Sequence, residues 1–480
     1  MALTPLYKRE YACIEKKIGN QAVAEISEDG LSDLLSKARE IQNQLCSIPV
    51  EERLIVIEKI GRAWTEKHRK GELEGLKNEL STSTGYGPKM IDMEFSLVPA
   101  ALSALSIKQN LRSSFPFEIS CLERFTAVGS NEYCWYRPRG PVFIISSGNS
   151  LIPPLIPTTI SLATGNMTLL RPSLANFLGV KAVYSLLEGI SGDVAELMRE
   201  ALAISYFSHD STSLEYLLTK SKVGVVNFWG GEPARTEISR RVSSNPHHPT
   251  LIINGPLTGY AIVDAASAGE SSALALARNI LLYDQQLCSS PTEGAFVGSW
   301  EEAVEFATLV GKKLDELTEI LPPKVTESYA YVIEGMRRSL QFKGSMVFKS
   351  ESSPSWTLAL SKSRSILDDA LRAFPEFGLH TRRRFMEIIV VEKYEDAIKM
   401  IEGLPKRKSF GGIDGVQSVG LSVSDDVRER LCTGLAERGI FRILPLEDMY
   451  MRSPLEPYDG MNLAQAFTYA VYRRDKPLEA

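Results

Sequence analysis

The chain has 480 residues, of which 44% are hydrophobic and 24% are charged, and its formal net charge is −5. This length suffices for two or three domains with a large buried core, and the composition is ordinary for a globular protein. The small negative charge gives no electrostatic signature of binding to nucleic acid or to an anionic membrane. No apolar run approaches the roughly 20 residues that a membrane-spanning helix needs.

The N-terminal residues contain no apolar segment of the kind that marks a secretory signal. The cysteines are scattered, without the spacing of a metal site or of a disulfide framework. They are Cys13, Cys46, Cys121, Cys134, Cys288 and Cys432. Only two histidines, His247 and His248, lie close together, and they fall in a loop-like segment. We therefore expect reduced thiols, a cytoplasmic location and no bound metal.

The first part of the chain, residues 1–123, is predicted to be helical. Apolar residues recur at helical spacing from Leu31 to Leu45, and a second helix is expected after Pro49. A polar, glycine-containing break interrupts this material from Ser81 to Met90. Such an opening is expected to pack against a larger domain.

Residues 124–140 predict a β-hairpin, with Gly129-Ser130-Asn131 as its turn. The segments PVFIISSGNS, LIPPLIPTTISLATG and NMTLLRPS then predict a strand, a helix and a second strand. Further short strands are expected at Leu202–Tyr206 and Val223–Phe228, after a helix from about Phe177 to Ser191. This alternation predicts a parallel sheet, whose ligands bind beyond the carboxyl ends of the strands. The turns SSGNS, RPSL and FWGGEPA are all expected at that edge.

A second alternating region follows residue 254. It predicts a helix at Ser272–Leu282 and several strands, and a further helix and strand close it. The strands are expected near Ala295–Gly298, Tyr329–Ile333, Ser345–Phe348 and Glu387–Val391. The predicted α/β architecture has two facing α/β domains, at residues 141–254 and 255–445, followed by a tail at 446–480.

Cys288 lies in the segment LLYDQQLCSSPTEGAFVG, between an apolar helical run and a buried strand. A thiol on a polar turn of small residues is accessible to a substrate, as thiolate chemistry requires. Free cysteine is nevertheless among the most often buried residue types, so this context alone leaves a structural role open.

At these motifs the sequence resembles the aldehyde dehydrogenase superfamily. SSGNSLIPPLIPTTISLATGNMTLLRPS is similar to its asparagine loop, helix and GN…K-P-S-E turn, FWGG to its FTGS turn, and DQQLCSSP to its cysteine loop. The form DQQxCSSP and the closing GVQSVGL…RGIFRILPLEDM…YDGM resemble a narrower branch, the LuxC-type acyl-CoA reductases of bacterial luminescence. The resemblance implies an aldehyde-dehydrogenase-like fold, with a Rossmann-like cofactor domain, a catalytic domain and a small β oligomerisation hairpin.

The resemblance also implies roles for individual residues. Cys288 would be the nucleophile, and Asn149 would hold the oxyanion together with the Cys288 backbone amide. Without the resemblance, Asn149 is an ordinary turn residue in a Ser/Gly/Asn cluster. The remaining positions that match the family's cofactor loops are Ser147, Arg171, Ser173, Gly230 and Gly231.

Two departures from the family pattern bear on the reaction. The glutamate that activates hydrolytic water in the oxidising enzymes falls on Ile252 or Ile253 here, and an isoleucine cannot deprotonate water. In the turn RPSL, Arg171 replaces a lysine and Leu174 replaces a glutamate that would repel a 2′-phosphate. These differences favour a reductase that uses NADPH, although Arg171 could equally be a surface residue beside a strand.

The implied reaction is the reduction of a fatty acyl thioester to the aldehyde through an acyl group on Cys288. The substrate would be an acyl-CoA or a carrier-bound acyl group, and an acyl-protein synthetase or acyltransferase is a possible partner. The hairpin and the C-terminal AFTYAVYRR could pair across subunits, as in related enzymes, so we expect a homo-oligomer. Two alternatives stay open, an acyl-cysteine carrier or acyltransferase without hydride transfer, and a non-catalytic cofactor-binding subunit.

Two further motifs have a simpler structural interpretation beside the functional one. Arg382-Arg383-Arg384 could hold the phosphates of coenzyme A or of the cofactor, but a solvated basic run is about twice as common. Tyr458-Asp459-Gly460-Met461 resembles a tail motif of the same branch, and a structural turn is the simpler interpretation.

Overall fold

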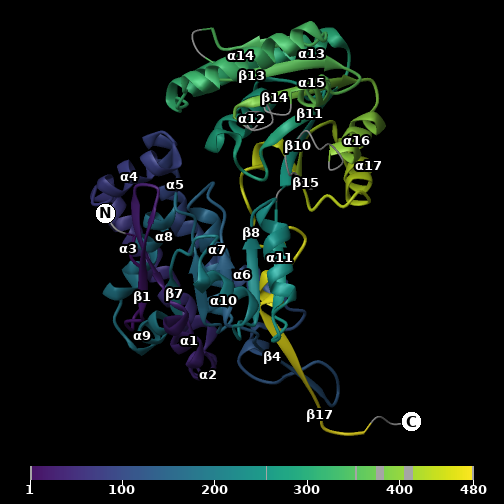
Figure 1. Ribbon diagram of the computed structural model, residues 1–480. Helices are drawn as coiled ribbons and strands as arrows, with labels where there is room; N and C mark the ends of the chain where they lie inside the picture. Colours follow the sequence, from purple (N-terminus) through teal and green to yellow (C-terminus); the bar gives the residue numbers. More distant parts are fainter. Residues whose placement is uncertain (1–2, 256, 352–353, 375–382, 405–414, 478–480) are drawn as a thin grey trace. The chain divides into compact units, whose positions relative to one another are not determined.

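The structure is a computed structural model that describes residues 3–255, 257–351, 354–374, 383–404 and 415–477 (Figure 1). The chain forms two compact units. The first unit comprises Met1–Thr84, Ile91–Asn254 and Ser453–Ala480, and the second unit comprises Gly85–Met90 and Gly255–Arg452.

The first unit opens with a β-hairpin that precedes the helices. Its strands are β1 (Cys13–Ile18) and β2 (Gln21–Ile26), which pair antiparallel around a turn where Gly19 has φ +60°. The prediction of an all-helical opening is therefore wrong for these residues. The helices that follow are α1 (Glu28–Ser36), α2 (Ala38–Ser47), α3 (Val50–Arg69), α4 (Glu74–Thr84), α5 (Pro88–Ala101) and α6 (Ala104–Ser114).

A five-stranded parallel sheet forms the centre of the first unit, in the order β7-β6-β5-β8-β9. The strands are β5 (Val142–Ile145), β6 (Thr168–Arg171), β7 (Leu202–Ile204), β8 (Val225–Trp229) and β9 (Thr250–Asn254). Helices α7 (Ile152–Ala163), α8 (Phe177–Ser185), α9 (Asp193–Glu200), α10 (Thr212–Thr219) and α11 (Ala234–Ser243) connect or flank them. The predicted parallel sheet is confirmed. Its strand order reverses direction between β5 and β8, which is where open α/β sheets bind ligands.

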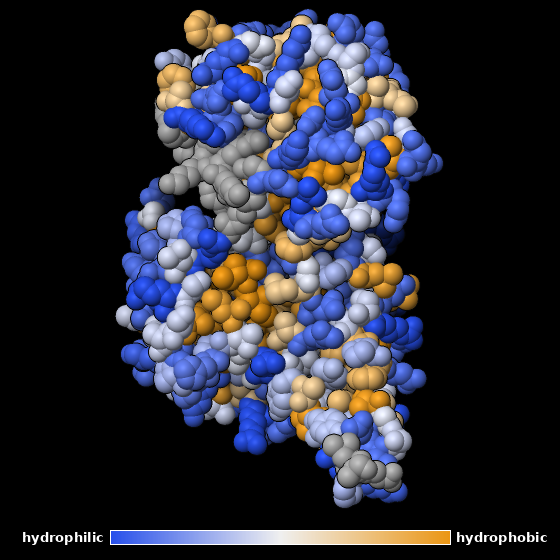
Figure 2. All heavy atoms as spheres, turned by 90° about the vertical axis from the view of Figure 1, so that its right-hand side faces the viewer, coloured by the Kyte–Doolittle hydropathy of each residue, from blue (hydrophilic) through white to orange (hydrophobic). Residues whose placement is uncertain are grey.

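A three-stranded antiparallel sheet completes the first unit, in the order β17-β4-β3. The hairpin of β3 (Thr126–Ala127) and β4 (Glu132–Pro138) is confirmed, and β17 (Thr468–Arg474) pairs with β4 along its whole length. The hairpin and the C-terminal strand thus pair with each other within the chain. Tyr469 and Tyr472 are exposed on β17. Figure 2 shows hydrophobic residues gathered in several patches between hydrophilic ones on the face that it draws.

The second unit is built on a seven-stranded sheet in the order β12-β13-β14-β11-β10-β15-β16, parallel except for β12. Its strands are β10 (Leu257–Asp264), β11 (Pro291–Val297), β12 (Met346–Lys349), β13 (Thr357–Lys362), β14 (Phe385–Val391), β15 (Gly415–Ser422) and β16 (Arg442–Pro445). Its helices are α12 (Glu270–Leu281), α13 (Trp300–Ile320), α14 (Glu327–Phe342), α15 (Ile366–Ala373), α16 (Tyr394–Gly403) and α17 (Asp425–Ala436).

The two faces of this sheet bury two separate hydrophobic clusters. Alternate residues of β10 illustrate the division, because Tyr260 and Ile262 join one cluster while Ala261 and Val263 join the other. The first cluster includes side chains of α14 to α17, and the second includes side chains of α12 and α13. Successive side chains of a strand point to opposite faces, so helices on both sides account for these almost fully apolar strands.

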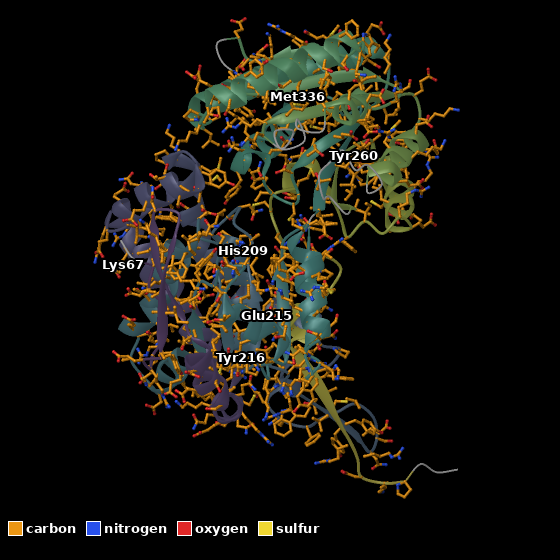
Figure 3. The ribbon with its side chains drawn as sticks, viewed as in Figure 1. Lys67, His209, Glu215, Tyr216, Tyr260 and Met336 are labelled. Carbon is orange, nitrogen blue, oxygen red and sulfur yellow. The ribbon has the colours of Figure 1, made fainter. Side chains whose placement is uncertain are left out.

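The strand predicted at Tyr329–Ile333 is wrong, because these residues lie in helix α14. Tyr329, Ile333, Met336 and Leu340 are buried at intervals of four, three and four residues, which places them on one helical face. Met336 belongs to the same cluster as Tyr260, and both are labelled in Figure 3.

No single helix among the described residues is both long and apolar enough to cross a membrane. Helices α5 and α6, bent by 59° relative to each other, meet the criteria of length and composition only as a pair. Helix α5 carries a buried carboxyl group, that of Glu94, beside its buried apolar residues Ile91, Phe95 and Val98.

The packing of α14 gives a direct test of this assignment. Met336→Ala should lower the free energy of unfolding by about 2–5 kcal/mol, because it removes a fully buried side chain and leaves a cavity. Phe342→Ala, on the same helix but 93% exposed, should change it by less than about 0.5 kcal/mol. Urea unfolding followed by tryptophan fluorescence compares the two variants, and equal losses would contradict the packing described here.

Candidate active site

Three loops carry the predicted cofactor residues, and all three follow neighbouring strands of the first unit. Ser147 and Asn149 follow β5, Arg171 and Ser173 end and follow β6, and Gly230 with Gly231 follows β8. Because these strands are parallel and adjacent, the loops share the carboxyl edge of the sheet. The structure therefore brings these predicted residues together, with the β5 and β8 loops on either side of the point where the strand order reverses.

The loop after β5 is held in place by the loop after β6. Ser147 Oγ donates to Asn149 Oδ1 at 2.9 Å, and Asn176 Nδ2 donates to the carbonyl oxygen of Ser150 at 2.8 Å. A Cβ atom at Gly148 would lie 3.0 Å from Ser173 Oγ, so the two loops are in contact and a side chain there would require Ser173 to shift. Asn149 is half-buried beside the fully buried Ser150.

Arg171 ends β6 and is half-buried rather than freely exposed. Its Nε donates to the carbonyl oxygen of Phe207 at 2.8 Å, and its guanidinium group lies over the ring of Tyr206 at 4.7 Å. Burial lowers the pKa of Arg171, and the nearby Tyr206 opposes this shift. These contacts fix the guanidinium plane through Nε. A bound phosphate would therefore meet the two Nη atoms, which make no hydrogen bond within the described part of the chain.

The glycine turn after β8 is fixed by a chain of buried amides. The backbone N–H of Gly230 donates to the carbonyl oxygen of Asn254 at 3.1 Å. Asn227 Nδ2 donates to Asn254 Oδ1 at 2.8 Å, and Trp229 Nε1 donates to Asn227 Oδ1 at 2.6 Å. Asn254 is the last residue of β9, so the end of this strand determines where the Gly230-Gly231 turn lies.

The C-terminal motif Tyr458-Asp459-Gly460-Met461 closes this network. It is a turn, with φ +48° at Asp459 and +77° at Gly460, and Tyr458 and Met461 form an antiparallel bridge. Asp459 Oδ2 accepts a hydrogen bond from Asn254 Nδ2 at 3.2 Å, and the rings of Tyr458 and Trp229 meet edge-on at 4.4 Å. The motif is thus a structural turn that also holds the loop carrying two predicted cofactor residues.

Cys288 lies in the second unit, on a turn with unusual backbone geometry. Tyr283, Asp284 and Gln285 all have positive φ, at 52°, 47° and 66°. Three successive left-handed residues cost about 1–2 kcal/mol each, so such a turn persists only where other contacts hold it. Cys288 itself is half-buried, whereas Cys46 and Cys121 are buried.

Two side chains fasten this turn to strand β14. Arg384 Nη2 and Nε both contact Asp284 Oδ1, at 2.6 and 2.7 Å, and the Arg384 side chain is only 3% exposed. Gln285 Nε2 donates to the carbonyl oxygens of Pro291 and Phe385, each at 2.7 Å, and Gln285 Oε1 accepts from the backbone N–H of Phe385 at 2.8 Å. The first two polar residues of the DQQLCSSP motif therefore hold the turn that presents Cys288.

Strand β10 abuts the same turn from the other side. The backbone N–H of Gly259 donates to the carbonyl oxygen of Ser290 at 3.0 Å. A Cβ atom at Gly259 would lie 2.0 Å from the carbonyl oxygen of Ser289, so only glycine fits at this point. The backbone of Ser289 and Ser290, directly after Cys288, is thus held against β10 by this hydrogen bond and by close packing.

The arginine run before β14 divides between the surface and the interior. Arg382 lies outside the described residues. Arg383 is exposed and lies over the ring of Tyr329 at 5.6 Å, and Arg384 is buried and paired with Asp284. The interpretation as a solvated run therefore fits Arg383 and is wrong for Arg384, and the phosphate role stays a prediction.

The position of the missing hydrolytic base is apolar in the structure. Ile252 is buried and Ile253 half-buried on β9, where they pair with Asn227 and Phe228 of β8. Among the described residues, no group of three or more histidine, cysteine, aspartate or glutamate side chains gathers as a metal site would require.

Sequence reasoning missed the residues that hold the site from a distance. Glu94, Asn254 and Arg384 each contact a loop that carries a predicted site residue, yet each comes from another part of the chain. A buried carboxyl at Glu94 was the one detectable signal, because a charged residue interrupts the apolar face of α5.

Comparison with solved structures identifies the fold. The chain resembles an NAD-dependent benzaldehyde dehydrogenase from Corynebacterium glutamicum, with a TM-score of 0.68 and 12% identity, covering 95% of this chain and 92% of that one. At this identity the likeness shows the fold alone, which is that of the aldehyde dehydrogenases. The fold class predicted from the sequence is thereby confirmed.

The family follows from the sequence. The profile of the acyl-CoA reductase (LuxC) family matches residues 45–470, so the chain belongs to this family. Two curated relatives are named long-chain acyl-protein thioester reductase. The one from Aliivibrio fischeri is 22% identical over 312 residues, and the one from Vibrio harveyi is 24% identical over 328 residues. The matches cover 65% and 67% of this chain and 63% and 64% of the relatives' lengths.

The fastening of the cysteine turn can be tested directly. Asp284→Ala should destabilise the protein by about 3 kcal/mol, because it leaves the buried Arg384 without a counter-charge. Glu402→Ala removes the exposed ion pair with Arg438 and should cost less than about 1 kcal/mol. Urea unfolding measures both losses, and hydrogen exchange of residues 286–290 should accelerate in the Asp284 variant alone. Unchanged exchange there would show that the ion pair does not hold the turn.

Proposed function

We propose that this protein reduces a fatty acyl thioester to the corresponding aldehyde, with NADPH as reductant and Cys288 as the covalent acyl carrier. The observation that carries the proposal is the half-buried thiol of Cys288, which follows the anchored turn of left-handed residues in a chain of the LuxC family. The names of the curated relatives support an acyl-protein thioester as donor. A cytoplasmic location and a homo-oligomeric state stay predictions.

In the first half-reaction the sulfur of Cys288 attacks the thioester carbonyl carbon. The carbonyl oxygen becomes an oxyanion, which the side-chain amide of Asn149 and the backbone N–H of Cys288 would stabilise. As the oxyanion collapses, the bond to the donor sulfur breaks, and the donor leaves as a thiol with the proton that the Cys288 thiol gives up. The acyl group is then a thioester of Cys288, and the overall change is one acyl transfer between two sulfur atoms.

The residues of the first unit fit a dinucleotide. The reversal point of the sheet, the Gly230-Gly231 turn and the Arg171 guanidinium group lie on one edge, as a dinucleotide site requires. NADPH, when bound, would supply a hydride to the carbonyl carbon of the acyl thioester. Asn149 would again stabilise the oxyanion on that carbon, and cleavage of the carbon–sulfur bond would return the electron pair to Cys288 as a thiolate and release the aldehyde.

The apolar stretch at the end of β9 favours reduction over hydrolysis. Ile252 and Ile253 offer no group that can take a proton from water, so a thioester on Cys288 would survive until hydride reaches it. An acyl-transferring protein would need the same stability of the acyl group. Only the production of aldehyde separates these two functions.

The central test uses Cys288→Ala. This variant should lose covalent acyl labelling, thiol release and aldehyde formation by at least about 1,000-fold, because the nucleophile is gone. Cys432→Ala removes another half-buried thiol of the second unit and should retain all three activities. Mass spectrometry locates the acyl group, and gas chromatography measures aldehyde formed from a long-chain acyl-CoA and NADPH.

The outcomes of this test are distinct. An acyl group found on another residue of the Cys288 variant would remove Cys288 from its role. Acylated Cys288 without NADPH oxidation or aldehyde would favour the acyl-transfer function.

A second test addresses the choice of nucleotide. Arg171→Ala should weaken NADPH binding by about 10-fold or more, because it removes charge-assisted hydrogen bonds to the 2′-phosphate, and should leave NADH binding nearly unchanged. Leu174→Glu should shift the preference in the same direction by repulsion. Arg240→Ala, on the exposed face of α11, serves as the charge-matched control. Fluorescence titration gives the two dissociation constants, and an equal loss for both nucleotides would show that Arg171 does not distinguish them.

A further inference from the structure

Helix α7 begins with an unusually small set of backbone donors. The first four N–H groups of a helix have no partner within it, and here they would belong to Leu151, Ile152 and the next two residues. Those two residues are Pro153 and Pro154, which have no N–H. Only the amides of Leu151 and Ile152 therefore need an acceptor from outside the helix.

Both amides depend on one carboxyl group. The N–H of Leu151 donates directly to Glu94 Oε1 at 2.5 Å. The N–H of Ile152 donates to Ser150 Oγ at 3.2 Å, and the Ser150 hydroxyl in turn donates to Glu94 Oε1 in a short hydrogen bond. Glu94, Ser150 and Leu151 are all at most 2% exposed, so water cannot substitute for this acceptor.

Burial of the Glu94 carboxyl group costs desolvation free energy, which its hydrogen bonds must offset. Burial raises the pKa of Glu94 to about 7, against the opposing effect of the hydrogen bonds from Ser150 and Leu151. A carboxyl at the N-terminal end of a helix also meets the positive end of the helix dipole. An apolar residue at this position of α5 would avoid the cost of desolvation but would leave two donors without an acceptor.

Asn149 is the residue immediately before this anchored segment. The side chain of Ser150 is held by Glu94 and its carbonyl oxygen by Asn176, so the backbone that carries Asn149 is fixed on one side at two points. On the other side, Ser147 Oγ donates to Asn149 Oδ1. Helix α5 thus reaches the predicted oxyanion residue through a single intermediate residue.

We propose that Glu94 is a positioning residue for the reaction, which holds Ser150 and Leu151 so that the Asn149 amide stays aimed at the developing oxyanion. The inference rests on the proposed function, which gives Asn149 that role. It assigns to α5, about 55 residues earlier in the chain, a part in acyl transfer to Cys288.

The same unit contains a matched control. Glu25, also 1% exposed, accepts a hydrogen bond from Ser211 Oγ at 2.8 Å, and Ser211 Oγ accepts the N–H groups that begin helix α10. Here too a buried glutamate and a serine hold a helix N-terminus, although Lys16 also pairs with Glu25. No predicted site residue lies on α10 or in the turn before it.

The experiment measures the acylation step alone. Myristoyl-CoA is mixed with excess protein in the absence of NADPH, and the release of coenzyme A is followed with a thiol reagent in a stopped-flow instrument. Asn149→Ala should slow release by about 100-fold, the usual loss for one oxyanion donor. Glu94→Ala should slow it by about 10-fold or more, and Glu25→Ala by less than about 3-fold.

A double-variant cycle separates positioning from general destabilisation. If Glu94 acts through Asn149, then Glu94→Ala should cost less than about 3-fold more once Asn149 is already alanine. Glu94→Gln keeps a carbonyl oxygen that can accept from Leu151 and Ser150, so it should restore part of the rate. If Glu94→Ala does not fold, Ser150→Ala replaces it in the cycle, because it breaks the same link and leaves the carboxyl group in place.

The contrary results are equally specific. A full loss from Glu94→Ala in the Asn149→Ala background, or wild-type acylation by the Glu94 variant, would overturn the positioning role. Wild-type rates in Asn149→Ala, or no acyl group on Cys288 in the unchanged protein, would instead overturn the proposed function on which the inference rests.

Discussion

The side-chain amide of Gln285 is the contact on which the geometry of the candidate nucleophile depends. It bridges the start of β11 and the start of β14 with three hydrogen bonds, and so holds a turn of three left-handed residues. Each left-handed residue costs about 1–2 kcal/mol, whereas a typical hydrogen bond returns about 1 kcal/mol. The three hydrogen bonds of the amide therefore offset only the lower end of a strain of about 3–6 kcal/mol, and the buried Asp284–Arg384 pair supplies a second contact that holds the turn. The conformation of the turn before Cys288 is therefore determined by contacts with β11 and β14 rather than by its own sequence alone.

The first unit uses the same device at its own loops. Asn254 holds the Gly230 turn, Asp459 of the C-terminal turn holds Asn254, and Glu94 holds the segment after Asn149. Asn254 contacts the Gly230 backbone with its main-chain carbonyl oxygen, whereas Asp459 and Glu94 accept hydrogen bonds with their side-chain carboxyl groups. In each case the acceptor comes from a segment that is distant in the sequence. A buried polar group lowers the stability of the fold unless it is hydrogen-bonded, so removing one member of such a network leaves its partners buried and unsatisfied. This explains why short motifs such as DQQLC and YDGM contain more polar residues than chemistry alone requires.

The sequence predicted the parallel sheets because their strands are short apolar runs separated by helices, a pattern that depends only on local residues. It missed the first hairpin, because neither CIEKKI of β1 nor QAVAEI of β2 shows the regular alternation of apolar and polar residues that marks a strand. It predicted a strand at Tyr329–Ile333 because aromatic and β-branched residues favour strands locally, while the decisive helical spacing appears only when Met336 and Leu340 are included. The candidate nucleophile and cofactor loops could be predicted from motifs, which are local. The pairing of Asp284 with Arg384 could not, since the two residues are 100 positions apart and no local pattern signals their proximity.

On strand β9, the isoleucines at the expected position of the hydrolytic base lie within a buried network that also holds a neighbouring loop. Ile252 is 4% exposed and pairs with Asn227, which is itself buried and hydrogen-bonded to Asn254 two residues further along the strand. A glutamate in place of Ile252 would add a carboxyl group to this buried edge, where desolvation raises its pKa and the charged form is costly. It would also compete for the Asn227 amide, which now fixes the end of β9 and, through Asn254, the Gly230 turn. Strand β9, which carries isoleucine at the expected position of the base, therefore also holds the Gly230-Gly231 turn, and a glutamate at residue 252 would disturb that turn.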